Sequence, residues 1–174
     1  MTLASPCFKP NADILDVCCG ARMFYDNQSK DRLDTIYMDI RSDITIEYEH
    51  AGSRTKSIWE IKPDIVGDFR EIPFEDNRFS LVVFDPPHLV SNSNGILNQK
   101  YGKLEKDWKE DIRKGFSECM RVLRPGGFLN FKWSEFNIPM SEISPLFPCR
   151  PMYYQRRGGR GFSGYWAMFR KGSQ

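Results

Sequence analysis

Short apolar runs recur along the first half of the chain, and each ends at residues that favour turns. Runs that are apolar throughout, rather than alternating with polar positions, are typical of strands covered on both faces of a parallel sheet. Pro86 and Pro87 stop the last run, because proline cannot donate a ladder hydrogen bond inside a central strand. The pattern predicts four parallel strands, at Ile14–Val17, Thr35–Met38, Asp64–Val66 and Phe79–Phe84.

A longer segment between Glu105 and Leu123 has the period of an α-helix. Its apolar residues recur at every third or fourth position with charges between them, and an Arg-Pro-Gly-Gly turn at residues 124–127 ends it. A fifth strand is expected directly after that turn. Two more strands flank a glycine- and arginine-rich loop and are predicted to pair antiparallel. These three strands are expected at Phe128–Trp133, Pro151–Gln155 and Gly164–Phe169.

One stretch departs from this alternation of strands and connections. Residues 44–61 contain two strand-like runs around a His-Ala-Gly turn, which predicts a β-hairpin insertion where a crossover helix is expected. A chain of 174 residues has the length of one domain. We therefore predict a single α/β domain over residues 1–174, with a mostly parallel sheet, an antiparallel C-terminal strand pair and helices on both faces.

Composition narrows the class of protein. Charged residues make up 28% of the chain, the mean hydropathy is −0.53, and no apolar run approaches the roughly 20 residues that span a bilayer. The N-terminus lacks the pattern of a secretory signal. The cysteines are odd in number and show no C-x-x-C spacing, which argues against a disulfide framework or a zinc site. We expect a cytoplasmic protein without a membrane segment or a bound metal.

Charge is distributed unevenly along the chain. No acidic residue follows Glu142, whereas six basic residues do, and the first 142 residues carry a net charge of −4. A basic end on a mildly acidic body indicates a polyanionic partner such as nucleic acid. The alternative is a solvated surface that happens to be basic.

Each of the four predicted parallel strands carries or ends at an aspartate: Asp16, Asp39, Asp68 and Asp85. Ligands of open α/β sheets bind outside the carboxyl ends of the strands. The first turn, at residues 18–23, has only one glycine of the G-x-G-x-x-G pattern that holds a pyrophosphate, and a Walker loop is absent. A nucleoside-like ligand with positive character, such as S-adenosylmethionine, fits better than a phosphate. Alternatively, the aspartates cap turns or helices.

Five motifs together resemble those of class I S-adenosylmethionine-dependent methyltransferases, in order and spacing. They are Ile14–Gly20, Asp39, Asp68, Asp85–His88 and Arg121–Gly127. The resemblance implies a Rossmann-like fold and S-adenosylmethionine as cofactor, with Asp39 on the ribose, Asp68 on the adenine amine and Asp16 orienting the first turn. The implied cofactor-binding residues are Asp16, Cys18, Cys19, Gly20, Asp39, Ile40, Asp68, Phe69 and Asp85. Cys18 and Arg22 replace residues that are usually glycine in the cofactor loop.

The tetrapeptide Asp85-Pro86-Pro87-His88 resembles the Asp/Asn-Pro-Pro-aromatic motif of methyltransferases that act on amino groups. The resemblance implies that Asp85 accepts one hydrogen of an exocyclic amine and that the Pro86 carbonyl accepts the other. Pro87 helps to hold the backbone rigid, and His88 stands where an aromatic ring usually stacks on the target base. The alternative is that the two prolines merely end a strand and Asp85 caps the turn.

Recognition of a substrate would fall to short segments, because the chain has no room for a separate recognition domain. Arg156, Arg157 and Arg160 lie on a glycine-rich loop and are predicted to contact phosphates, unless they simply face solvent. We therefore expect methylation of an exocyclic amine, adenine N6 or similar, in RNA or DNA. Methylation of a small molecule or a protein side chain, and a non-catalytic cofactor-binding subunit, are the alternatives. The sequence indicates no oligomeric state.

Overall fold

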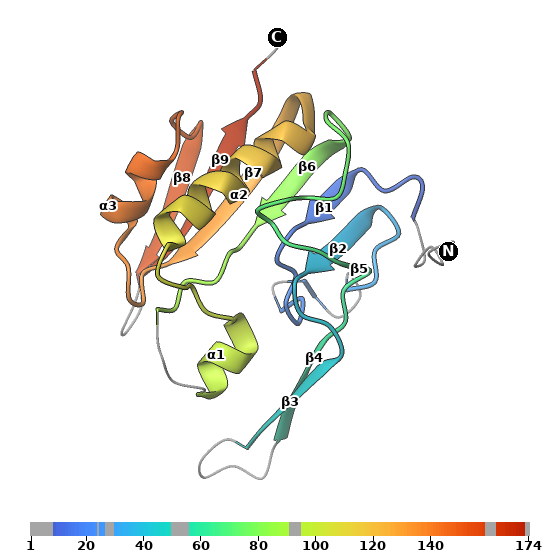
Figure 1. The fold of residues 1–174 in the computed structure, drawn as a ribbon, viewed down its shortest axis with the longest axis vertical. Helices are drawn as coiled ribbons and strands as arrows, with labels where there is room; N and C mark the ends of the chain where they lie inside the picture. The colour runs from blue at the N-terminus through green and yellow to red at the C-terminus, as the bar shows by residue number, and fades with distance from the viewer. Residues whose placement is uncertain are drawn as a thin grey trace.

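The structure is a computed structural model, and it describes residues 9–23, 25–26, 30–49, 56–90, 95–158 and 163–172. Nine strands and a few helices follow one another along these residues (Figure 1). The elements are β1 (Ile14–Asp16), β2 (Thr35–Asp39), β3 (Ile44–Glu49), β4 (Lys56–Ile61), β5 (Ile65–Val66), β6 (Phe79–Phe84), α1 (Ile96–Tyr101), α2 (Trp108–Val122), β7 (Leu123–Ser134), α3 (Met140–Ile143), the 3-10 helix η1 (Ser144–Leu146), β8 (Tyr153–Gly158) and β9 (Ser163–Arg170).

Seven of the strands form one sheet in the order β5-β2-β1-β6-β7-β9-β8. The strands from β5 to β7 run parallel, whereas β9 is antiparallel to β7 and to β8. The predicted parallel sheet and its antiparallel C-terminal pair are thereby confirmed. The predicted hairpin is also present as β3 and β4, which form a separate two-stranded sheet; its residues 50–55 lie outside the described residues.

The main core lies between α2 and one face of the sheet. Ile112 and Phe116 are buried on α2, and the Phe116 ring stacks on Phe147 with 4.5 Å between ring centroids. Phe147 also contacts Phe131 of β7 edge to face, at 4.9 Å, so the segment after η1 packs on the same face as α2. Gly115 allows α2 to approach β6 closely, because a Cβ at this position would lie 2.7 Å from the Phe84 ring. Aromatic side chains therefore cover this face of the sheet.

Helix α2 covers this face of the sheet in the described part of the chain (Figure 1). Over β1 and β2, the opposite face is covered by the irregular segment that joins the two strands. Tyr25 packs edge to face on Tyr37 of β2 at 5.3 Å, and the Arg22 guanidinium lies 3.9 Å from the centre of the Tyr37 ring. Polar and aromatic contacts thus replace the helix that commonly joins parallel strands.

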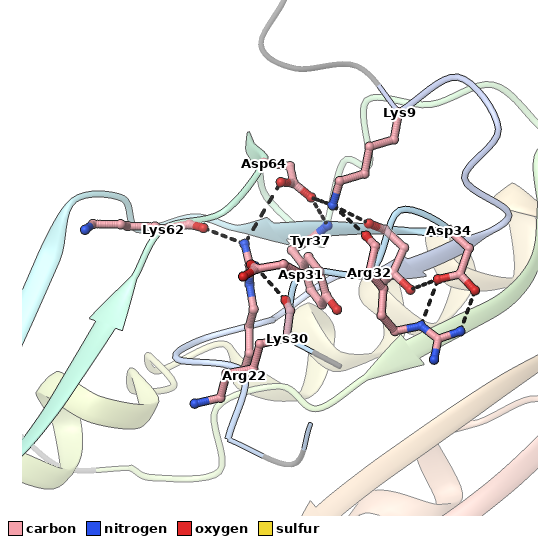
Figure 2. A network of polar contacts seen from close by, with 10 residues as sticks. Lys9, Arg22, Lys30, Asp31, Arg32, Asp34, Tyr37, Lys62 and Asp64 are labelled. Carbon is pink, nitrogen blue, oxygen red and sulfur yellow. Dashed lines mark hydrogen bonds and ion pairs between the residues drawn. The ribbon is translucent and has the colours of Figure 1, made fainter. Parts of the chain in front are cut away.

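Figure 2 shows the polar network that fixes this segment. Arg22 donates to the carbonyl oxygens of Lys30, at 2.8 Å, and Lys62, at 2.7 Å. Asp64 accepts from the Lys9 ammonium, at 2.9 Å, and from the Tyr37 backbone amide, at 3.0 Å. The network therefore connects the β1–β2 segment to the start of β5. The Arg22 side chain stabilises the fold by holding this segment in place.

Several elements differ from the predicted ones. Helix α2 begins at Trp108, three residues later than expected, and β7 begins at Leu123, before the Arg-Pro-Gly-Gly turn. The turn lies inside β7 because the register with β6 is irregular, pairing Phe79 with Leu123 but Leu81 with Phe128. The bulge accommodates the extra residues. The short helices α1 and α3 were not predicted, since segments of six and four residues carry too little periodicity.

Candidate functional site

Two neighbouring cavities open at the carboxyl ends of the parallel strands, near α1. Their volumes are about 510 and 180 Å³. They share the lining residues Cys18, Arg41, Asp85 and Tyr101, so they meet at the end of β6. We call the larger one the first cavity and the smaller one the second cavity. The first is also lined by Val17, Asp39, Ile40, Phe69, Pro87, Asn98, Gln99, Gly102 and Lys103, and the second by Cys19, Gly20, Ala21, Met23, Pro86, His88, Lys100 and Lys132.

Asp85 lies where the two cavities meet, directly after β6. Its Oδ2 accepts a hydrogen bond from the Lys132 ammonium at 2.7 Å, across the register between β6 and β7. Its Oδ1 is shielded from solvent and has no hydrogen-bond partner among the described residues. Burial raises the pKa of Asp85, and the Lys132 charge acts in the opposite direction. Asp85 therefore has one buried oxygen without a hydrogen-bond donor. Leaving this oxygen unpartnered costs free energy unless a ligand donates a hydrogen bond to it.

His88 is more enclosed than a stacking residue in an open pocket would be. Its ring is 8% exposed and lies between Tyr101 and Trp133, with centroid distances of 5.5 and 6.3 Å. Burial, helped by the nearby Lys132 charge, lowers the pKa of His88 to about 4. His88 is therefore a neutral ring at neutral pH. Tyr101 of α1 lines both cavities and offers a second ring beside it.

The predicted cofactor loop reaches the cavities through its backbone. Gly20 has a φ of +49°, a conformation that favours glycine, and its amide donates to the Asp39 carboxylate at 2.9 Å. Asp39 is buried and also accepts from the backbone amide and guanidinium of Arg41, at 3.0 and 2.9 Å. Arg41 in turn donates to the carbonyl of Gln99 in α1. Asp39 and Ile40 thus line the first cavity, with the Asp39 carboxylate held by protein donors.

The other two strand-end aspartates do not line either cavity. Asp16 is fully buried and accepts from the Cys18 amide, at 3.3 Å, and the Tyr25 hydroxyl, at 3.1 Å. Burial raises the pKa of Asp16 to about 7. Asp68 is held by Arg70 through its backbone amide and guanidinium, which lower the pKa of Asp68. Its neighbour Phe69 does line the first cavity.

Two of the three arginines predicted to bind substrate lie on β8. Arg156 and Arg157 are successive residues of β8, so their side chains leave the sheet on opposite faces. The Arg156 guanidinium lies 5.6 Å from the Tyr165 ring centre and 3.6 Å from the Glu135 carboxylate. Arg160 lies outside the described residues. Of this predicted set, the two described arginines therefore do not share one face of β8.

Several residues that line these cavities were not singled out from the sequence, among them Lys132, Arg41 and Tyr101. Lys132 is the one charged residue in the mostly apolar run from Phe128 to Trp133, and that contrast is the signal for it. Arg41 follows Asp39 by two residues, a spacing that permits a local ion pair. Tyr101 carries no signal, because its place depends on the fold of the segment between β6 and α2.

Two other findings concern the described part of the chain only. No group of three or more histidine, cysteine, aspartate or glutamate residues there is arranged to hold a metal ion. No helix there is long and apolar enough to cross a membrane.

Comparison with known proteins defines the fold. No protein-family model matches the chain, and no curated protein matches it. A solved methyltransferase dependent on S-adenosylmethionine, from Methanosarcina mazei, is 14% identical, with 94% of each chain covered and a TM-score of 0.58. The N-methyltransferase NodS of Bradyrhizobium japonicum WM9 is 13% identical, with 93% of this chain and 86% of that chain covered and a TM-score of 0.57.

A third solved structure, the [4+2]-cyclase SpnF, is 12% identical, with 92% of this chain and 74% of that chain covered and a TM-score of 0.52. Together these structures show that the chain has the fold of class I S-adenosylmethionine-dependent methyltransferases. The cyclase shows that this fold does not fix the reaction, so the function is argued from the site.

Proposed function

We propose that the chain is an S-adenosylmethionine-dependent methyltransferase that acts on an exocyclic amine, adenine N6 or similar, in nucleic acid. The observation that carries the proposal is Asp85. A carboxylate with a shielded, unpartnered Oδ1 stands where two cavities meet, and a cation holds its other oxygen. An amine with two hydrogens supplies the donor that this oxygen lacks.

The first cavity has the residues and the size for the cofactor. Its volume of about 510 Å³ is within the range of sites for ligands of this size. Asp39 would accept from the ribose hydroxyls once Arg41 stops donating to one of its carboxylate oxygens, and Ile40 and Phe69 would flank the adenine ring. Phosphate groups are not required, which agrees with a loop that has only one glycine of the phosphate-binding pattern. When bound, S-adenosylmethionine supplies an electrophilic methyl group.

The second cavity would hold the acceptor amine. Asp85 Oδ1 accepts one N–H and the Pro86 carbonyl accepts the other, which draws the nitrogen towards tetrahedral geometry and concentrates its lone pair. As the nitrogen bonds to the methyl carbon, the bond between that carbon and the cofactor sulfur would break, and Asp85 Oδ1 would take the proton that the nitrogen releases. Lys132 holds Oδ2 throughout and so orients Oδ1. Most of the rate then comes from positioning.

The rings beside Asp85 would hold the flat group that carries the amine. His88 is neutral near pH 7 because burial lowers its pKa to about 4, so it contributes a polar ring without repelling Lys132. Tyr101 supplies the larger aromatic surface. If the target base lies in a duplex, it has to leave the stack to reach this position.

A small free amine is the second candidate substrate. The second cavity has a volume of only about 180 Å³, which suits a compact acceptor as well as the edge of a base. Methylation of metabolites rather than nucleic acid would favour this candidate.

The proposal is tested by transfer of a labelled methyl group from S-adenosylmethionine to unmodified DNA, total RNA, peptides and small amines. Arg124→Ala, an exposed arginine paired with Asp13 away from both cavities, is a matched control beside Asp85→Ala. We expect label in DNA or RNA with the native chain and the control, and its loss with Asp85→Ala. Label only in peptides or metabolites would refute the nucleic-acid substrate.

A further inference from the structure

A third cavity lies between η1 and the antiparallel strands β8 and β9, on the same face of the sheet as α2. Its volume is about 770 Å³, and it shares no lining residue with the two cavities at Asp85. Two buried rings, Phe147 and Phe169, line it together with the half-buried Tyr165 and with Tyr154, which is 67% exposed. We call it the Tyr154 cavity.

The charge of the Tyr154 cavity is of one sign. Arg150 and Arg156 line it, and no carboxylate does. Glu135 pairs with Arg156 at 3.6 Å, whereas Arg150 has no ion pair among the described residues. The sequence adds to this, since every charged residue after Glu142 is basic. An exposed aromatic ring next to arginines is a surface that suits stacked bases and phosphates.

The Tyr154 cavity also lies within reach of the acceptor site. The strand register places Trp133 beside Tyr165 and Tyr165 beside Arg156, while the Trp133 ring contacts His88 on its other side. From the end of β6 to β8 there are three strand spacings, or roughly 14 Å. A nucleotide next to a base held at Asp85 would have to span this separation across the sheet to enter the cavity.

We propose that the Tyr154 cavity binds an unpaired nucleotide of the substrate strand, near the nucleotide that is methylated. Its base stacks on Tyr154, and its phosphate is bound by Arg156 and Arg150. This inference rests on the proposed function, because it names single-stranded nucleic acid as the form of the substrate. It also explains why an exposed tyrosine and arginines lie on a strand that has no other partner than β9 in the described sheet.

Binding of a fluorescent single-stranded oligonucleotide, as RNA and as DNA, tests the proposal. Tyr154→Ala is expected to weaken binding about tenfold, since one stacked base is worth that much or more, whereas Tyr154→Phe keeps the ring and the affinity. Arg156→Ala is expected to weaken binding and to reduce the salt slope by about 0.7. Arg113→Ala, an exposed arginine on α2 outside the cavity, is the matched control and leaves both unchanged. Equal affinity for all variants overturns the proposal.

Cys149 gives a second readout that needs no substitution. It is exposed and lines the Tyr154 cavity, so a bound nucleotide shields its thiol from iodoacetamide. Peptide mapping by mass spectrometry then measures how fast Cys149 is alkylated with and without the oligonucleotide. Slower alkylation supports the proposal. An unchanged rate, or shielding by an acidic peptide but not by the oligonucleotide, overturns it.

The proposed function and this inference fail in different ways. If the oligonucleotide binds in the Tyr154 cavity but receives no methyl group, the methylation of nucleic acid is wrong and the binding site stands. If the oligonucleotide is methylated while Tyr154→Ala binds it normally and Cys149 stays reactive, the function stands and the site is wrong.

Discussion

Replacing Lys132 by methionine leaves the Asp85 carboxylate without the cation that lies 2.7 Å from it. At the 2.7 Å separation, two unit charges attract by about 1.5 kcal/mol in bulk water and by about 6 kcal/mol at an effective dielectric constant of about 20. The side chains of Asp85 and Lys132 are only 15% and 21% exposed, so the contact is closer to the buried case. We therefore expect Lys132→Met to lower the free energy of unfolding by about 3 kcal/mol.

A double-mutant cycle separates this ion pair from the packing of the lysine stem. Asp85→Asn with Lys132→Met leaves no buried charge, so the double variant is expected to be more stable than the sum of the single effects by about 2 kcal/mol or more. Urea unfolding of the four proteins measures the coupling energy. A coupling below about 1 kcal/mol, the size typical of exposed pairs, would refute the reasoning.

The same variant has a predicted pH dependence. Without Lys132, only burial acts on Asp85 and its pKa rises further above the value in the unfolded chain. The folded state then binds the proton of Asp85 more tightly than the unfolded chain does. The stability of Lys132→Met therefore falls as the pH rises from the unfolded pKa of Asp85 to its folded pKa. The loss relative to the native chain is therefore larger at about pH 8 than at about pH 5. An equal loss at both pH values would contradict the ion-pair account.

Three further predictions concern the fold around the site. Asp16→Asn removes a carboxyl whose pKa rises from 3.8 to about 7 on folding. As the pH rises between those two values, the native chain should lose about 4 kcal/mol of stability and the variant should not, as measured by urea unfolding. Arg22→Ala should lower stability by about 2 kcal/mol, seen as a lower thermal midpoint, because two backbone carbonyls lose their donor. Gly115→Ala places a Cβ 2.5 Å from Phe69, so calorimetry should show weaker S-adenosylmethionine binding and a loss of about 1–2 kcal/mol in stability.

The strands could be predicted because each is a local apolar run, and the structure confirms the sheet they form. The flanking turn-forming residues are enough to delimit two largely buried strands, Ile14 to Asp16 and Phe79 to Phe84. The β1–β2 connection could not be predicted, because Arg22 holds it through residues that are distant in sequence, such as Lys62. A pattern of apolar positions carries no information about such long-range polar contacts.

The candidate site was predictable where its chemistry is local in sequence. Asp39 ends β2 and Asp85 directly follows β6, and both line the first cavity. Lys132 becomes part of the site only through the register of β7 on β6, and a one-residue slip would place it on the other face. Asp68 shows the converse, because a neighbouring arginine holds its carboxylate and keeps it out of the cavity lining. Sequence order indicates which strand ends meet, whereas side-chain partners depend on the folded register.

The central claim is that the unpartnered oxygen of Asp85 accepts a hydrogen of the substrate amine. The most direct measurement compares the rate of methyl transfer and the affinity for S-adenosylmethionine in the native chain, Asp85→Asn and Asp85→Ala. We predict that the cofactor affinity stays within about threefold, while kcat falls at least about 100-fold in Asp85→Ala and less in Asp85→Asn, whose amide oxygen still accepts a hydrogen bond. An Asp85→Ala variant that transfers methyl groups at the native rate would contradict the account.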